Sequence, residues 1–183
     1  FLASAKGGQS IVKPADLPSF SAMQSLIMAS GLYKYDRNQL AQWLRNRPME
    51  VNLSITEYID GMQARSKTDG VDDLFSYLYL VLNKQRFDQQ IFDKWLQRKR
   101  YIYDSKPQQG REAVDREISE LLNPITEANP REDNTFYDKM KLSDLPRLYA
   151  EHFGDASQLT GCLVGDISEA EAKRIVTTYL AAL

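Results

Sequence analysis

The chain has 183 residues, enough for one ordinary domain or two very small ones, and 43% of them are hydrophobic. Since 10% are also aromatic, the chain can bury a core and need not be disordered. The formal net charge of −2 excludes a global attraction to nucleic acid or to an anionic membrane, and a single cysteine excludes an internal disulfide. The longest apolar run, LFSYLYLVL, is too short to span a bilayer, and any targeting segment is expected to lie outside this chain.

The first residues, FLASAKGGQSIV, predict a short strand, a turn at Gly7-Gly8 and a second short strand. The first strand begins abruptly, and Phe1 to Ala5 have the character of the end of an element that is already under way.

Helical spacing of apolar residues begins near Pro18 and predicts the first helix. Its buried face is expected to carry Phe20, Met23, Leu26 and Ile27. Gly31 is expected to end this helix in a left-handed cap. Asp36 is then expected to cap a second helix, which must end before Pro48.

The clearest strand is EVNLSITEYI, because apolar and polar residues alternate along it. The apolar set, expected on the buried side, is Val51, Leu53, Ile55 and Ile59. The dipeptide Asp60-Gly61 suits a tight turn, and MQARSK is expected to return from it with Met62 and Ala64 on the buried side. This segment therefore predicts a β-hairpin with its turn at Asp60-Gly61.

Three more helices are predicted in the middle of the chain. The first is capped by Thr68 or Asp69 and has an apolar body, which predicts burial between layers. The second begins near Asp88, and the third covers REAVDREISELL. The apolar face of the second consists of Phe87, Ile91, Trp95 and Ile102. Residues 123–142 are polar with two prolines and are expected to form a surface connection.

The last part of the chain predicts a helix, a strand and a helix, in the segments SDLPRLYAEHF, LTGCLVG and SEAEAKRIVTTYLAAL. Ser168 and Glu171 match a capping box at the start of the last helix. No internal repeat is visible. The predicted fold class is therefore α+β, with helices around a largely antiparallel sheet, in a single domain over residues 1–183.

The only histidine, His152, and the only cysteine, Cys162, raise the question of an active site. A zinc site of both with a carboxylate is one alternative, but one histidine cannot supply a two-histidine motif. A Cys162 nucleophile with His152 as base is another, but the apolar neighbours of Cys162 disfavour a thiolate. We therefore expect Cys162 to be buried, inert and slow to alkylate. The residues predict no catalytic, cofactor-binding or metal-binding side chain.

Residues 84–111 carry an excess of Lys and Arg with aromatic residues between them, a composition found on nucleic-acid surfaces. The favoured interpretation is that the aromatic residues lie on the buried face of a helix and the charges on its solvated face. The alternative is a free-standing binding module that contacts an anionic partner through this basic face, including Arg98, Lys99 and Arg100.

The closing segment AEHFGDASQLTGCLVGDISEAEAKRIVTTYLAAL contains three short runs with an apolar strand and a helix between them. The runs are Phe153, Gly154, Asp155, Ala156 and Ser157, then Val164, Gly165, Asp166 and Ile167, then Tyr179, Leu180 and Leu183. Together they resemble the non-catalytic domain of insulinase/pitrilysin-type zinc metalloproteases, particularly the large bacterial ones. AKGGQSIV, ASGLYKYDRNQLAQWL, the hairpin and VDDLFSYLYLVLNKQRFDQQIFDKW also follow in the family's order. The departures from the family pattern are His152, Gln158, Gly161 and Cys162.

The family's zinc motif, His-x-x-Glu-His with a downstream glutamate, is absent from this chain. Because the family carries that motif in its first domain, the resemblance implies a later, metal-free domain, the third of four, with the family's metallohydrolase-type fold. That fold also implies further N-terminal strands before Phe1, in agreement with the abrupt start of the first strand. It implies a parent zinc metallopeptidase that encloses peptides between two bowl-shaped halves, with zinc in its catalytic domain. The implied partners are the other domains of the same chain and a peptide substrate, with no nucleic acid and no membrane. The implied location is the periplasm or cytoplasm of a bacterium, with the periplasm favoured.

Overall fold

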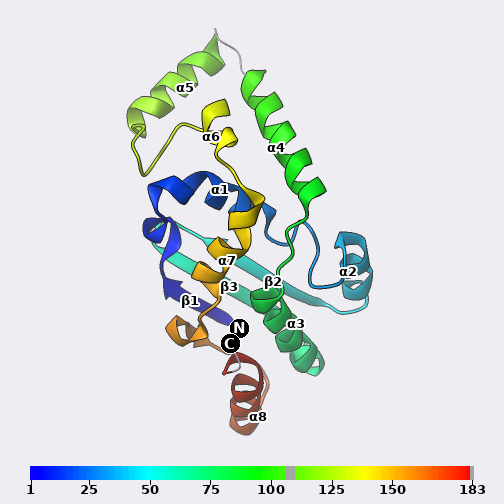
Figure 1. The fold of residues 1–183 in the computed structure, drawn as a ribbon. Helices are drawn as coiled ribbons and strands as arrows, with labels where there is room; N and C mark the ends of the chain where they lie inside the picture. Colours follow the sequence, from blue (N-terminus) through cyan, green and yellow to red (C-terminus); the bar gives the residue numbers. More distant parts are fainter. Residues whose placement is uncertain (106–109, 182–183) are drawn as a thin grey trace.

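The computed structural model describes residues 1–105 and 110–181. The strands and helices, in chain order, are β1 (Leu2–Lys6), α1 (Leu17–Leu26), α2 (Arg37–Leu44), β2 (Met49–Ile55), β3 (Ile59–Ser66), α3 (Val71–Asn83), α4 (Gln89–Asp104), α5 (Arg111–Leu122), α6 (Asn134–Asp138), α7 (Leu145–Phe153), β4 (Thr160–Cys162) and α8 (Glu169–Ile175). The strands form one sheet in the order β2-β3-β1-β4, and each neighbouring pair is antiparallel (Figure 1). The predicted α+β class with an antiparallel sheet is confirmed.

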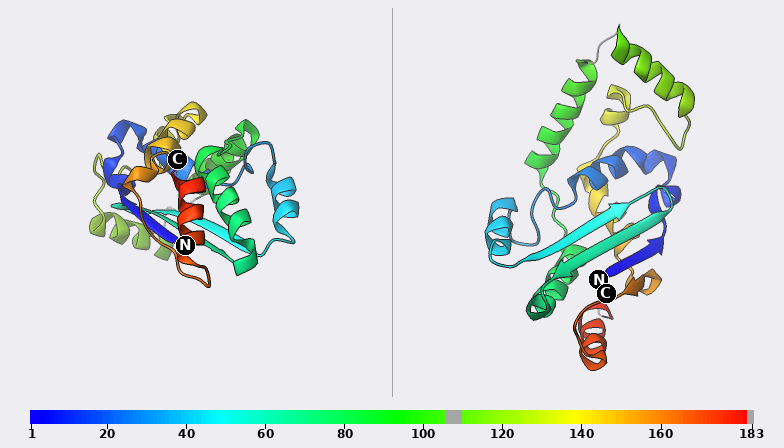
Figure 2. Two further views of the ribbon diagram at one scale, coloured as in Figure 1. Left: turned by 90° about the horizontal axis from the view of Figure 1, so that it is seen from below. Right: turned by 180° about the vertical axis from the view of Figure 1, so that it is seen from behind.

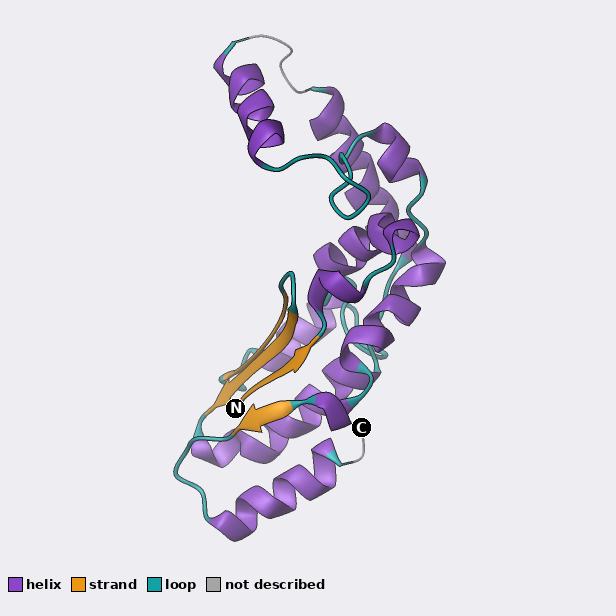
Figure 3. Cartoon of the chain, turned by 90° about the vertical axis from the view of Figure 1, so that its left-hand side faces the viewer, coloured by secondary structure: helices purple, strands orange, loops and turns teal. Residues whose placement is uncertain are grey.

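The helices lie on one side of the sheet, and its other face is open (Figure 2, right). Seen from the side, the strands form one edge of a curved molecule with α5 at one end and α8 at the other (Figure 3). The inward-facing strand residues Ala3, Met62 and Ala64 share one core with buried residues of the helices. These helix residues include Phe20, Met23, Phe75, Leu78 and Leu148. The core therefore lies between the sheet and the layer of α1, α3 and α7.

The hairpin is confirmed, but its predicted turn is wrong. Asp60 and Gly61 lie inside β3, opposite Ile55 and Ser54, and residues 57–58 form the turn. Thr56 closes it: its backbone N donates to the carbonyl of Ile59 at 2.9 Å, and its Oγ1 accepts from the Ile59 N at 3.0 Å. Since the turn comes earlier, Ile59 is exposed rather than buried.

The second strand predicted after Gly7-Gly8 is also absent. Gly8–Ile11 form a 3₁₀ turn that covers the tip of the hairpin. The backbone N of Gly7 donates to Tyr58 O at 2.9 Å, and the N of Ser10 donates to Glu57 O at 2.8 Å. Gly8 has a φ of 64°, and a Cβ there would collide with the backbone of residues 56–59. The Gly-Gly pair therefore allows the chain to wrap the hairpin tip.

Helix α1 ends at Leu26, earlier than the cap predicted at Gly31. Three left-handed residues redirect the chain toward α2: Met28 with a φ of 64°, Gly31 with a φ of 88° and Tyr33 with a φ of 53°. The Asp36 cap is confirmed, because its carboxylate accepts from the N of Asn38 and of Gln39 at 2.8 and 2.9 Å.

The apolar body of α3 is buried as predicted, but Gly70 precedes it as the N-cap and Thr68–Gly70 form a 3₁₀ turn. The Asp88 cap of α4 is confirmed, because its side chain accepts from the N of Gln90 and of Ile91. The predicted burial of Ile102 is wrong. The second half of α4 extends with α5 beyond the sheet, so its side chains have no sheet to pack on (Figure 1).

Residues 123–142 are more than the predicted surface connection, because they contain α6. Phe136, Tyr137 and Met140 from this segment are buried in the main core. Asp133 caps α6 by accepting from the Phe136 N at 2.9 Å.

At the C-terminal end, Ser168 caps α8 by accepting from the Glu171 N at 3.2 Å, which is one half of the predicted capping box. The Glu171 side chain accepts from Arg174 at 2.9 Å. A π-helical turn, Val176–Leu180, continues the helix. Strand β4 is shorter than the predicted segment and pairs only with β1. Arg174 joins α8 to α3, since its Nη2 is 2.8 and 3.0 Å from the two carboxylate oxygens of Asp72. Leu183 of the family resemblance lies outside the described residues.

We expect this link between α8 and α3 to weaken in acid. The hydrogen bond from Arg174 lowers the pKa of Asp72 below its usual value. A lowered folded-state pKa means that the stabilisation is present at neutral pH and is lost as the pH falls from about 4 through the pKa of the folded state. Since the pair is about half exposed, we expect no more than about 1 kcal/mol. The free energies of unfolding in urea of the unsubstituted 183-residue chain and of Asp72→Asn should differ at neutral pH and converge toward about pH 2. A difference that stays constant over this range would contradict the assignment.

Candidate functional site

The single histidine forms a buried pair with an acid from the sheet. His152 lies near the end of α7, and its Nδ1 is 2.9 Å from both Oδ1 and Oδ2 of Asp60 on β3. The side chains are 0% and 3% exposed, respectively. The ring of Phe20 lies 5.1 Å from the imidazole, measured between ring centroids. Within the described part of the chain, His152 Nε2 has no hydrogen-bond partner.

The pair fits closely against the N-terminal segment. A Cβ on Gly7 would collide with Oδ2 of Asp60, so the carboxylate occupies space that only a glycine leaves free. Since neither member reaches solvent, the pair joins α7 to β3 in the interior and does not present a base to a substrate. Asp60 was missed from the sequence because its dipeptide with Gly61 predicts a turn.

Cys162 is exposed, so its predicted burial is wrong. In the register of β4 with β1, Gly161 pairs with the buried Ala3 and Cys162 pairs with the exposed Leu2. Because strand side chains alternate, Cys162 lies on the open face of the sheet, whereas Asp60 and His152 lie on the helix side. The two rare side chains are therefore on opposite faces. The apolar neighbours of Cys162 misled the prediction, because Cys162 lies on the face of the sheet that the described helices leave open.

We now expect Cys162 to alkylate readily in the folded protein. An exposed thiol on an open sheet face is accessible to a small reagent, unlike a core cysteine. Mass spectrometry after timed exposure to iodoacetamide should give folded-state and denatured-state rates within about tenfold of each other. A folded-state rate that is about a hundredfold or more below the denatured-state rate would show that the Cys162 thiol is buried.

No three His, Cys, Asp or Glu side chains among the described residues gather closely enough to hold a metal ion. In the same residues, none of the helices combines the length and the apolar character that a membrane span requires.

The basic face on α4 is partly neutralised by neighbouring segments. Lys99 pairs with Glu132 at 3.5 Å, and Arg100 pairs with Asp138 of α6 at 2.7 Å. Arg98 is exposed. Since two of the three cations proposed for an anionic partner already have acidic partners in the fold, the structure favours the interpretation of a solvated helix face.

The open face of the sheet carries a shallow depression of about 580 Å³. Its residues include Leu2, Ser4, Asn52, Ser54, Gly61, Gln63, Thr160 and Cys162. The side chains among them are uncharged, and most can donate or accept a hydrogen bond. This surface can therefore contact a peptide backbone without selecting for charge.

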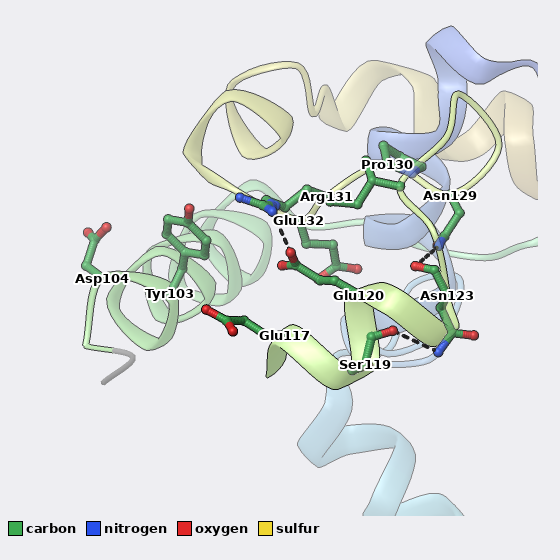
Figure 4. A pocket seen from close by; sticks show the side chains of 11 residues that line it. Tyr103, Asp104, Glu117, Ser119, Glu120, Asn123, Asn129, Pro130, Arg131 and Glu132 are labelled. Atoms are coloured by element: carbon green, nitrogen blue, oxygen red, sulfur yellow. Dashed lines mark hydrogen bonds and ion pairs between the residues drawn. The ribbon is translucent and has the colours of Figure 1, made fainter. Parts of the chain in front are cut away.

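A polar cleft of about 620 Å³ lies between the end of α4, helix α5 and the segment that follows α5 (Figure 4). Among the described residues that line it, the acidic ones, Asp104, Glu117, Glu120 and Glu132, outnumber the basic one, Arg131. Arg131 Nη2 donates to Glu120 Oε2 at 2.6 Å. The sequence did not predict this cleft, because its residues come from three segments with no common motif.

The fold is that of domains found in known proteases. Solved structures that match this chain over its whole length include M16-type, or insulinase-type, peptidases, so the resemblance is confirmed at the level of fold. No family model and no curated protein matches the sequence.

Three solved structures illustrate the likeness. The periplasmic protease PqqL from Escherichia coli has a TM-score of 0.84 and 11% identity, and the match covers 100% of this chain and 20% of PqqL. The ferredoxin protease FusC, solved as a mutant in complex with Arabidopsis ferredoxin, has a TM-score of 0.80 and 13% identity, with 98% of this chain and 20% of FusC covered. The peptidase M16 inactive domain from Pseudomonas fluorescens has a TM-score of 0.72 and 16% identity, with 100% of this chain and 44% of that chain covered. This chain thus spans about a fifth of the first two and under half of the third.

Proposed function

We propose that this chain is a metal-free domain of a zinc metallopeptidase of the insulinase/pitrilysin type. The observation that carries the proposal is the match of the whole chain to a minor part of much longer proteases and to a domain described as inactive. The absence of His-x-x-Glu-His supports it, as does the burial of the only histidine against Asp60. In the parent protein, zinc is held by the catalytic domain.

In this proposal the chain forms part of the wall of a chamber that encloses peptides. The hollow on the open sheet face supports this role, because its neutral donors and acceptors suit contact with varied, extended peptides. The partners are the other domains of the same polypeptide and the peptide. We place the protein in the bacterial periplasm by analogy with the periplasmic protease PqqL.

Peptide cleavage tests this function. The 183-residue chain and the complete polypeptide encoded by its gene should be compared on unstructured peptides. We expect cleavage by the complete polypeptide and none by the 183-residue chain. Salt-dependent retention of the chain on an anionic resin, lost after Arg98→Ala, Lys99→Ala and Arg100→Ala, would instead favour the binding module.

A further inference from the structure

Helix α5 has an exposed apolar stripe with no partner among the described residues. Its four side chains, with their exposed fractions, are Val114 (53%), Ile118 (49%), Leu121 (80%) and Leu122 (76%). Their spacing places them on one face of the helix. The helix lies at the end of the molecule farthest from the two termini (Figures 1 and 3), and the described residues leave this face exposed.

Helix α5 presents its polar side chains to the cleft formed with the rest of the chain. Glu117, Ser119 and Glu120 face the polar cleft, and Glu120 forms the ion pair with Arg131 (Figure 4). A helix of a single globular domain turns its apolar side inward and its polar side to water. Among the described side chains of α5 only the small Ala113 is buried, the polar side lines the open cleft, and the four larger apolar side chains face away from it, which is the pattern of a helix that docks on something else.

We propose that the apolar stripe of α5 docks on another domain of the same polypeptide. This inference rests on the proposed function, since the protein is then a piece of a larger protease. In the matched structures of PqqL and FusC, four fifths of the chain lies outside the region that corresponds to this one. The protein therefore has ample further chain to supply a covering surface.

The area of the stripe is large enough for an interface. From their exposed fractions, the four side chains present on the order of 400 Å² of apolar surface. A standard interface buries about 800 Å² on each partner, and a little over half of that area is apolar, so the stripe supplies about the apolar area that one side needs. Linkage within one polypeptide keeps two such surfaces at a high effective concentration, which favours a neighbouring domain over a second copy of the chain. The occupant we infer is thus an apolar helix or groove of a neighbouring domain.

Hydrogen–deuterium exchange tests the inference. We expect the backbone amides of α5 to exchange at least about tenfold more slowly in the complete polypeptide than in the 183-residue chain. The double variant Leu121→Lys and Leu122→Lys should abolish the slowing. The matched control is Val164→Lys, which changes an 82% exposed apolar residue outside the stripe. This variant should keep the slower exchange of α5 in the complete polypeptide. Circular dichroism should show the same helix content in all variants.

The outcomes separate this inference from the proposed function. If α5 exchanges equally fast in both proteins while the complete polypeptide cleaves peptides, the docking is refuted and the function stands. If the gene encodes no His-x-x-Glu-His domain, the proposed function is refuted, and so is the inference that α5 docks on another domain of such a protease. A dimer of the 183-residue chain in sedimentation velocity, broken by the double variant, would assign the stripe to a second copy and overturn the inference.

Discussion

Replacement of Asp60 by alanine is expected to lower the free energy of unfolding by about 3–5 kcal/mol, one of the two largest effects that we predict. The change leaves His152 in the core without the carboxylate that contacts its Nδ1 at 2.9 Å, and a buried polar group without a partner is costly. Unfolding in guanidinium chloride, followed by the fluorescence of Trp43 and Trp95, measures the loss.

Two controls distinguish this pair from an ordinary ion pair. Asp73→Ala removes an exposed acid, 3.4 Å from Arg47, and should lower the free energy of unfolding by under about 1 kcal/mol. Replacing Asp60 and His152 together by leucine should be less damaging than Asp60→Ala, because no buried polar group is left alone. A loss for Asp60→Ala no larger than that for Asp73→Ala would show that the pair is not buried in solution.

Phe75→Ala is expected to lower the free energy of unfolding by a similar amount, about 3–5 kcal/mol. Phe75 of α3 is fully buried, and its ring centroid lies 5.3 Å from that of Phe1 and 6.3 Å from that of Tyr179. The substitution would leave a cavity where α3, the start of β1 and the C-terminal turn meet. The same guanidinium titration provides the measurement.

Tyr101→Ala serves as the control for this second prediction. Tyr101 is also an aromatic residue of a helix, but it is exposed, so its loss should change stability by under about 0.5 kcal/mol. Equal losses for the two variants would contradict the placement of Phe75 at the centre of the core.

Local signals predicted most of the helices and the hairpin. The caps at Asp36, Asp88 and Ser168 are side chains that satisfy nearby backbone groups, so their evidence lies within a few residues. The alternation in β2 reflects one buried and one open face. The turn position was wrong because Asp60-Gly61 has the composition of a turn, whereas the contacts that place it at 57–58 come from the distant N-terminal segment.

The candidate site was much less predictable. Asp60 and His152 are 92 positions apart, and no local pattern links them. The exposure of Cys162 depends on which strands have a helix behind them, which is a tertiary property. The buried Phe136 and Tyr137 were missed because they occupy a short apolar run within a polar, proline-containing segment. The apolar face of α5 has the period of an ordinary buried helix, so only the structure shows that it faces outward.

Zinc content is the most direct test of the claim that this chain is the metal-free part of a zinc metallopeptidase. Elemental mass spectrometry should be applied to the 183-residue chain and to the complete polypeptide after dialysis against metal-free buffer. The account predicts about one zinc ion per complete polypeptide and essentially none on the 183-residue chain. Stoichiometric zinc on the 183-residue chain, together with peptide cleavage that a chelator abolishes, would contradict it.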